Sequence, residues 1–412
     1  MNVAVIGGGI SGLMVADQLN GHVDYTLFEQ ADYLGGHANT HTVYVDGKNI
    51  QVDTGFIVYN EHIYNHFADM LQRYQVKSIK SDMSFAVSNR VSGLEYNATD
   101  LKRMFCQKTN LFNPQFYRMI WDIKRFYGVA ETALKSGTKV GIYEYLKDNN
   151  YSTYFINEHI IPMVSALWSG DFESVKDYPL VYLLQFMKNH QMLQLNKRPQ
   201  WRTIAQGSQS YVKAIEKNMT GVVKRNTAVK GVERSNHGVS VITDTERQEF
   251  DYVVFATHSD VSLALMLDAT EPERKALAAI PYVENHMDLH TDFSLLPQNK
   301  KAWASWSVNK HVANKPVCTV NYYMNLLQSL SCDTPVIVSL NQHEYINNRQ
   351  ILLSKKYHHP VYTKNTLTAQ LAINQLQGEN NTYFCGAYLG WGFHEDGARS
   401  GVKVANKIKQ LQ

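Results

Sequence analysis

The chain has 412 residues, of which 44% are hydrophobic and 19% charged, and its formal net charge at pH 7 is +3. This proportion of hydrophobic to charged residues excludes a disordered chain, and the length predicts about two domains. The small net charge gives no argument for a nucleic-acid partner. Four widely spaced cysteines predict reduced thiols in a cytoplasmic protein. No uncharged apolar run approaches the ~18 residues of a membrane-spanning helix.

The first 36 residues predict a dinucleotide-binding unit. An apolar strand at the start of the chain is followed by a glycine turn, a helix and a second strand that ends on Glu29. Because the strand begins at once, we expect no signal peptide. In such a unit the glycines allow a tight turn, pyrophosphate approach and close helix packing, and the helix N-terminus offers free N–H groups. The acid lies where one hydrogen-bonds a ribose hydroxyl. The cofactor-binding candidates here are Gly7, Gly9, Ser11, Gly12 and Glu29.

A second glycine pair, Gly35-Gly36, follows and is succeeded by His37. This extension resembles the flavin amine oxidase and phytoene desaturase superfamily, in which a glycine pair and a basic residue wrap the FAD pyrophosphate. The resemblance implies non-covalent FAD rather than NAD, with these three residues at the pyrophosphate. His37 stands where arginine is usual, which weakens one phosphate contact.

The next part of the chain predicts a hairpin and then a helical block. Residues 43–55 alternate in polarity around Asp46-Gly47, which is typical of a hairpin. The segment that follows resembles the superfamily's passage beside the flavin, which implies that Thr54 and Gly55 contact the cofactor. The predicted helices cover residues 61–77, 98–134 (broken near Pro114), 142–146, 152–170 and 177–195.

Two stretches of this block leave alternatives open. Residues 105–127 interleave aromatic side chains with Arg118, Lys124 and Arg125. We favour a core helix of a lid domain, but an interfacial helix on a lipid surface fits the same pattern, and the two interpretations are not exclusive. The uncharged run 160–169 is typical both of buried helix packing and of an apolar substrate channel.

The second half of the chain predicts mostly strands. The predicted strands are 222–223, 228–234, 238–243, 250–257, 286–291, 302–308, 318–325, 336–341 and 382–388, with a helix over 271–280. The run into the strand 250–257 resembles the superfamily's return to its FAD domain. That resemblance implies that Val229 contacts adenine, while Thr257 lies at the ligand end of the sheet.

A glycine-rich turn and a predicted helix over 398–411 close the chain and resemble the superfamily's last FAD motif. The implied cofactor contacts are Gly386, Trp391, Asp396 and Gly397. The helix dipole would stabilise negative charge on the reduced flavin. His394 and Glu395 are the catalytic candidates, for orienting substrate or transferring protons, and shaping the turn is an equal alternative. Sixteen histidines show no paired ligand spacing, so we predict no metal site.

Nearly the whole chain resembles a bacterial subfamily of FAD-dependent, amine-oxidase-like proteins. This subfamily is similar to the flavin-binding N-terminal region of plant cyclopropane fatty acid synthases and to desaturases of methylated fatty acyl chains. The blocks that carry the resemblance are VDTGFIVYNE, YFINEHIIPMVSALWS, KRPQWRTI, DYVVFATHSD, LHTD, YYMNLLQ and FCGAYLGWGFHEDG. It implies an α/β fold, with a Rossmann-like, amine-oxidase-type FAD-binding domain and an interleaved α+β substrate or lid domain. The first domain is expected from 1–60, 196–262 and 378–412, and the second from 61–195 and 263–377.

The resemblance further implies an FAD-dependent oxidoreductase. The favoured activity is desaturation of a lipid acyl chain, such as a methylated or unsaturated fatty acid of phospholipid. A flavin amine oxidase and a redox-neutral fatty acid double-bond isomerase stay open, as does a non-enzymatic flavoprotein partner of a lipid methyltransferase. The expected partners are a lipid or fatty acyl substrate, the inner membrane face as a peripheral contact, and a lipid methyltransferase.

Overall fold

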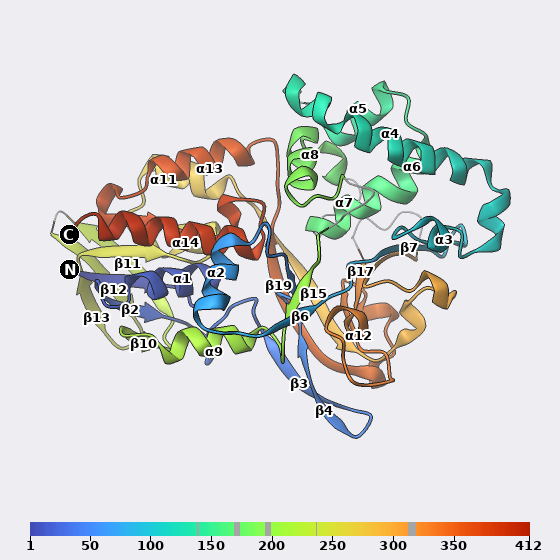
Figure 1. The fold of residues 1–412 in the computed structure, drawn as a ribbon. Helices are drawn as coiled ribbons and strands as arrows, with labels where there is room; N and C mark the ends of the chain where they lie inside the picture. Colours follow the sequence, from blue (N-terminus) through green and yellow to red (C-terminus); the bar gives the residue numbers. More distant parts are fainter. Residues whose placement is uncertain (138–139, 169–173, 194–198, 236, 312–318) are drawn as a thin grey trace.

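The computed structural model describes residues 1–137, 140–168, 174–193, 199–235, 237–311 and 319–412 (Figure 1). One part of the fold, which holds both termini, is built on a parallel sheet, and the other on a mixed sheet beside a block of helices. None of the described helices is long and apolar enough to cross a membrane. The division into an FAD-binding and a substrate domain stays a prediction.

The five-stranded parallel sheet has the order β10–β2–β1–β14–β20, so it joins strands from distant parts of the chain. Its strands are β1 (Asn2–Ile6), β2 (Asp24–Phe28), β10 (Val222–Lys224), β14 (Tyr252–Phe255) and β20 (Thr382–Phe384). Successive side chains of a strand point to opposite faces. Accordingly, Val3 and Val5 enter one hydrophobic cluster, whereas Ala4 and Ile6 enter another.

Helices cover both faces of this sheet (Figure 1). The face of Val3 and Val5 packs against α1 (Ile10–Leu19), α2 (Asn65–Arg73), α9 (Gln209–Lys217) and α14 (His394–Lys409). The opposite face packs against α10 (Ser259–Leu265), α11 (Glu271–Ala278), α13 (Thr366–Gln375) and a small sheet of β11 (Val229–Ser235), β12 (Gly238–Thr243) and β13 (Arg247–Phe250). The predicted helix 271–280 is confirmed, and Thr270 and Glu273 form a capping box at its start.

Three predicted boundaries in this part are wrong. The strand expected over 382–388 ends at Phe384 as β20, and the 3-10 helix η9 (Ala387–Leu389) follows it. The single strand expected over 250–257 is two strands, because β13 pairs with β12 while β14 pairs with β1, and the Asp251 amide donates to the Asn2 carbonyl between them. Helix α14 begins at His394 rather than at residue 398. The Asp396 carboxylate accepts from the Phe393 amide and satisfies a donor at the new helix start.

The mixed sheet has seven strands in the order β19–β15–β18–β17–β16–β7–β8. Their bounds are β7 (Phe85–Asn89), β8 (Leu94–Asn97), β15 (Tyr282–His290), β16 (Trp306–Lys310), β17 (Val320–Tyr323), β18 (Ile337–Leu340) and β19 (Ile351–Pro360). The sequence did not predict β7, β8 or β19. The strand expected over 302–308 begins only at Trp306, and the strand expected over 318–325 gives way to helix α12 (Met324–Leu327), while residue 318 lies outside the described residues.

The helical block is confirmed in position but is more broken than predicted. It consists of α3 (Leu101–Met104), η1 (Lys108–Phe112), α4 (Pro114–Ser136), α5 (Ile142–Asp148), α6 (Thr153–Phe155), η2 (Ile156–Ile160), α7 (Ile161–Trp168), η3 (Ser174–Asp177) and α8 (Leu180–Asn189). The ends of two predicted helices, at 169–170 and 194–195, lie outside the described residues. Pro114 starts α4, with the Asn113 side chain as its cap.

Smaller elements connect these parts. The predicted hairpin is confirmed as β3 (Thr40–Val45) and β4 (Lys48–Asp53), with positive φ at Asp46 and Gly47. A three-stranded sheet orders β5 (Val58–Tyr59), β9 (Arg202–Ile204) and β6 (Ser78–Lys80). The short 3-10 helices are η4 (Phe293–Leu295), η5 (Lys300–Ala302), η6 (His343–Tyr345), η7 (Asn348–Gln350), η8 (Glu379–Asn381) and η9 (Ala387–Leu389).

Candidate active site

The glycine turn between β1 and α1 presents bare backbone to a cavity. Gly7 has φ +107°, and a Cβ placed on Gly12 would lie 1.9 Å from the Gly7 carbonyl oxygen, so these two glycines serve the packing of turn and helix. A Cβ on Gly9 would meet no atom within 4 Å. The first amides of α1 have no partners within the helix, so they are available to an anion beside Gly9.

The segment after Glu29 folds back onto this turn. The Gly35 amide donates to the Gly8 carbonyl at 2.8 Å, and the Glu29 carboxylate accepts from the Gly8 and Ala31 amides, each at 2.8 Å. A Cβ on Gly55 would lie 2.3 Å from the His37 carbonyl oxygen. The predicted extension therefore meets both the glycine turn and the segment after β4.

The imidazole of His37 faces the cavity with an unused polar atom. Its Nε2 is buried and has no hydrogen-bond partner, and its ring stacks on Tyr357 with the centroids 4.9 Å apart. Burial lowers the pKa of His37 well below its ordinary 6.5, and His359 and His258 nearby lower it further. The side chain is therefore neutral at pH 7 and can still donate one hydrogen bond.

The cavity has a volume of about 1650 Å³ and extends from the glycine turn to the helical block. Among the predicted site residues, it is lined by Gly7, Gly9, Ser11, Glu29, Gly35, Gly36, His37, Thr54, Gly55, Thr257, Gly386, Trp391 and His394. The structure thus brings together residues that are widely separated in the sequence. The predicted residues outside the lining are Gly12, Val229, Glu395, Asp396 and Gly397.

Three of these outlying residues have packing contacts. Gly397 lies where α14 meets α1, since a Cβ there would be 2.9 Å from the Ser11 Oγ. Gly12 packs the glycine turn, as described above. Val229 packs against the hydrophobic cluster beneath the parallel sheet. Their roles in cofactor binding stay predictions.

Three successive side chains in the first turn of α14, those of His394, Glu395 and Asp396, have different surroundings. The His394 Nε2 lies 2.7 Å from the Tyr211 hydroxyl, and its ring stacks on Phe56 at 3.7 Å between centroids. Burial lowers the pKa of His394 to about 3, so the imidazole is neutral. Of the two catalytic candidates, His394 lines the cavity and Glu395 does not.

The two acids of this turn organise backbone. The Glu395 carboxylate accepts from the His66 and Phe67 amides, each at 3.0 Å, and so caps α2. Burial raises its pKa to about 7. Asp396 accepts from the Trp391 amide at 2.9 Å and pairs with Arg399. For Glu395 these contacts support the alternative that it shapes the turn, and the cofactor contact of Asp396 stays a prediction.

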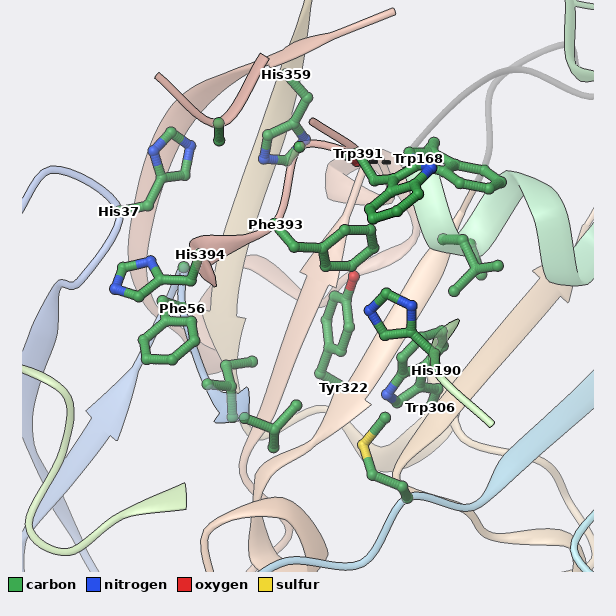
Figure 2. A pocket seen from close by; sticks show the side chains of 18 of the residues that line it. His37, Phe56, Trp168, His190, Trp306, Tyr322, His359, Trp391, Phe393 and His394 are labelled. Atoms are coloured by element: carbon green, nitrogen blue, oxygen red, sulfur yellow. Dashed lines mark hydrogen bonds between the residues drawn. The ribbon is translucent and has the colours of Figure 1, made fainter. Parts of the chain in front are cut away.

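The far end of the cavity is aromatic. Figure 2 shows Phe393 in the middle of this part, and the side chains around it are Trp168, His190, Trp306, Tyr322 and Trp391. The Trp168 Nε1 donates to the Trp391 carbonyl at 3.1 Å. Burial lowers the pKa of His190 to about 4. From the apolar run 160–169, residues Met163, Ala166, Leu167 and Trp168 line the cavity, and residue 169 lies outside the described residues.

Strand β19 contributes lining residues that the sequence analysis missed: Lys355, Lys356, Tyr357, His358 and His359. The alternation of Ile351, Leu353 and Tyr357 is the signal that could have found this strand. His359 lies beside His37, with 5.5 Å between ring centroids. The strand thus brings basic and imidazole groups to the cofactor end of the cavity.

One group of metal-ligating side chains lies outside this cavity. Within the described residues, His286, Asp288 and His343 place one ligand atom each within 4.8 Å of one another. The His343 Nδ1 lies 3.0 Å from Asp288, and Ser354 also donates to that carboxylate. Hydrogen bonds account for one oxygen of Asp288 only, because the His286 Nε2 and the Asp288 Oδ2 are buried without a hydrogen-bond partner. The absence of a metal site stays a prediction.

Comparison with known proteins settles the family. Residues 10–287 match the model of the flavin containing amine oxidoreductases. The chain belongs to this family. It is accordingly an FAD-dependent oxidoreductase, as the sequence predicted, with the mixed α/β, amine-oxidase-type fold. A search of curated proteins found no match.

Several solved structures have the same fold as this chain. A CLA-producing fatty acid isomerase from P. acnes has a TM-score of 0.70 at 15% identity and covers 98% of both chains. Cyclohexylamine oxidase from Brevibacterium oxydans IH-35A has a TM-score of 0.69 at 14% identity, over 100% of this chain and 99% of its own. Putrescine oxidase bound to putrescine gives 0.68 at 10% identity, over 99% of each. At such identities the likeness concerns the fold alone.

The residues present fit FAD. The open face of Gly9 admits a pyrophosphate beside the free amides of α1, and the unpartnered His37 Nε2 lies in the same cavity. The cavity continues past Thr54 and Gly55 toward the aromatic part, which gives space for a long cofactor and a substrate together.

Proposed function

We propose that this oxidoreductase removes hydride from the acyl chain of a lipid and leaves a new carbon–carbon double bond. The observation that carries the proposal is the composition of the cavity beyond the cofactor end. That part is lined mainly by apolar side chains: Met83, Phe85, Met104, Ile120, Ile123, Met163, Ala166, Leu167, Leu327, Val338 and Leu340. An acyl chain gains about 0.8 kcal/mol for each CH₂ group that such a surface takes from water.

The charged side chains of the cavity argue against a cationic amine as substrate. Among the described residues of the lining, the carboxylates are Glu29, Asp82 and Asp100. Glu29 accepts from two amides, Asp82 accepts from the Ser84 amide and the Ser305 hydroxyl, and Asp100 caps α3. The described lining also includes Lys124, Lys355 and Lys356. This balance suits an uncharged chain with an anionic head group better than an ammonium group.

The side chains around the reacting carbon suit hydride loss. Bound FAD would supply the hydride acceptor. The proton lost from the neighbouring carbon would pass to the neutral imidazole of His190, whose Nδ1–H donates to the Phe186 carbonyl and leaves Nε2 free to accept it. Because burial keeps His394 and His190 neutral, neither presents a positive charge to a carbon that becomes electron-poor. The faces of the aromatic rings around Phe393 are electron-rich and favour such a carbon. The apolar lining also excludes water and holds the chain in one orientation.

Two other activities of this fold family stay in view. The fatty acid isomerase that shares the fold is named for an acyl substrate, which supports a lipid in this cavity and makes a redox-neutral isomerase the second candidate. The amine oxidases share the fold equally well, and the lining charges are the reason to rank that activity lower.

Anaerobic reduction of the bound flavin tests the proposal. Purified protein loaded with FAD is mixed with detergent-dispersed phospholipid bearing unsaturated or methyl-branched chains, and in parallel with putrescine and cyclohexylamine. We expect the flavin's visible absorbance to fall only with the lipid, and the product chain to lose two hydrogens by mass spectrometry. An acyl product of unchanged mass, formed without net flavin reduction, would indicate an isomerase. Reduction by the amines alone would refute the proposal.

A further inference from the structure

The helical block lies far from both termini (Figure 1), and its first helices carry an exposed apolar surface. It consists of Leu101 on α3, Leu111 and Phe112 on η1, and Tyr117 and Trp121 on α4, and we call it the α3–α4 patch. Phe112 is 87% exposed, more than any other large apolar side chain of the described residues. Aromatic side chains displayed in this way are costly in water and typically mark an interaction site.

The patch is also the edge of the cavity. Leu101, Tyr117 and Trp121 are exposed and at the same time belong to the cavity lining. Directly inside them the lining continues with Met104, Ile120 and Ile123. The apolar interior is therefore continuous with the apolar surface at this point.

Core packing does not explain the exposed face. Helix α4 buries a different face, formed by Phe116, Met119, Phe126, Ala130 and Ala133, against the rest of the helical block. Tyr117, Trp121 and Lys124 follow one another at helical spacing on the side that meets the cavity edge. The buried face of α4 thus suits the interpretation as a core helix, and its exposed face suits the interpretation as an interfacial helix.

The positive charge of the protein is concentrated here. Residues 101–127 contain six lysines and arginines and one acid, a net +5, whereas the whole chain carries +3. The single acid, Asp122, is buried and pairs with Arg118 at 3.3 Å and Arg125 at 3.2 Å. The same two guanidinium groups lie over Trp121, at 4.6 and 5.0 Å from its ring. Outside this segment the chain is net negative.

We propose that the α3–α4 patch docks on the surface of an anionic phospholipid bilayer and that an acyl chain enters the cavity between Leu101, Tyr117 and Trp121. Apolar side chains at the level of the acyl chains, with lysines and arginines among the head groups, are the arrangement of a peripheral interfacial helix. The negative remainder of the molecule orients this face toward the membrane. The entry route rests on the proposed lipid substrate, whereas the docking itself does not.

Vesicle flotation tests the docking. The FAD-loaded protein is mixed with vesicles of phosphatidylglycerol and phosphatidylcholine, or of phosphatidylcholine alone. We expect binding to the anionic vesicles, lost at high salt, and weak binding to the neutral ones. Phe112→Ser, outside the cavity lining, is expected to weaken vesicle binding about tenfold. Lys108→Ala is expected to weaken it about fivefold.

Matched controls carry the same changes elsewhere. Leu371→Ser alters an exposed leucine of α13, and Lys403→Ala alters an exposed lysine of α14. Neither is expected to change vesicle binding. Equal binding to neutral vesicles, or a Phe112→Ser protein that binds like the wild type, would overturn the proposal. A patch that instead joins two copies would show as a dimer in light scattering that Phe112→Ser makes monomeric, and that result would also overturn it.

Oxidation of detergent-dispersed lipid separates this proposal from the proposed function. We expect Phe112→Ser to reduce flavin reduction by vesicle lipid while leaving reduction by detergent-dispersed lipid unchanged. If no lipid in either form reduces the flavin while vesicle binding still depends on Phe112, then the docking holds and the desaturase function fails. If dispersed lipid reduces the flavin but no vesicle binds, then the function holds and the docking fails.

Discussion

The open face of Gly9 provides a direct test of cofactor binding through the Gly9→Ala variant. Gly9 has φ −73° and ψ −178°, which an alanine adopts without strain, and its added methyl group would meet no protein atom. Alanine restricts the backbone of the unfolded chain more than glycine does, which stabilises the folded protein by about 0.4–1 kcal/mol. Alanine is a poorer helix N-cap by a similar amount. The free energy of unfolding without FAD should therefore change by less than about 1 kcal/mol.

The same methyl group occupies space that the pyrophosphate needs beside the first amides of α1. Losing one hydrogen bond to a charged group costs about 1.5–3 kcal/mol, which corresponds to FAD binding weaker by about 10- to 150-fold. Titration of the protein with FAD, followed by quenching of flavin fluorescence, measures this loss, and thermal unfolding without FAD measures the stability.

Gly12→Ala is the contrasting variant. Its Cβ would lie 1.9 Å from the Gly7 carbonyl oxygen, so the turn must move, and we expect a loss of at least about 1–3 kcal/mol in stability before any cofactor is added. Unchanged FAD affinity in Gly9→Ala would refute the placement of the pyrophosphate. Equal destabilisation of both variants without FAD would show that Gly9 acts in folding rather than in binding.

Three further predictions concern single side chains. Burial raises the pKa of Glu395 from its ordinary 4.5 to about 7, so the folded protein binds this proton more tightly than the unfolded chain does. The protonated carboxyl therefore contributes its full stabilisation below about pH 4.5, and this contribution is lost as the pH rises to about 7. In urea unfolding the free energy of unfolding of the wild type should fall across this pH range, and that of Glu395→Gln should change less. His37→Leu removes a buried nitrogen without a partner, so we expect equal or higher melting temperature without FAD but weaker FAD binding by calorimetry. Leu167→Trp narrows the apolar end of the cavity and should raise the KM for long acyl chains while the FAD affinity stays unchanged.

The elements that the sequence predicted are those whose signals are local. The strand β1, the glycine turn and α1 follow from apolar runs and glycines within a few residues, and the β3–β4 hairpin follows from its Asp46-Gly47 turn. The capping box at Thr270 likewise lies within four residues of sequence. In each case the contacts that determine the conformation are close along the chain.

The elements that were missed depend on distant partners. Strand β19 carries polar residues over most of its second half, because that half borders the cavity rather than a core, and its position is fixed by pairing with β15. The early start of α14 depends on the Asp396 carboxylate rather than on helix-forming residues. The capping of α2 by Glu395 joins residues 328 positions apart, a contact that no local pattern can reveal.

The role of each residue at the start of α14 therefore has to be inferred from the group that its side chain contacts. His394 meets Tyr211 and Phe56 at the cavity wall, Glu395 holds the start of α2, and Asp396 holds the turn through the Trp391 amide. A carboxylate that caps a helix next to a flavin site has the raised pKa that is usual for a catalytic acid. The hydrogen bonds from the His66 and Phe67 amides account for the burial of the Glu395 carboxylate through the capping of α2. Loss of activity in a Glu395 variant would consequently identify a catalytic acid only if α2 stays folded, as judged by the protection of its amides from hydrogen exchange.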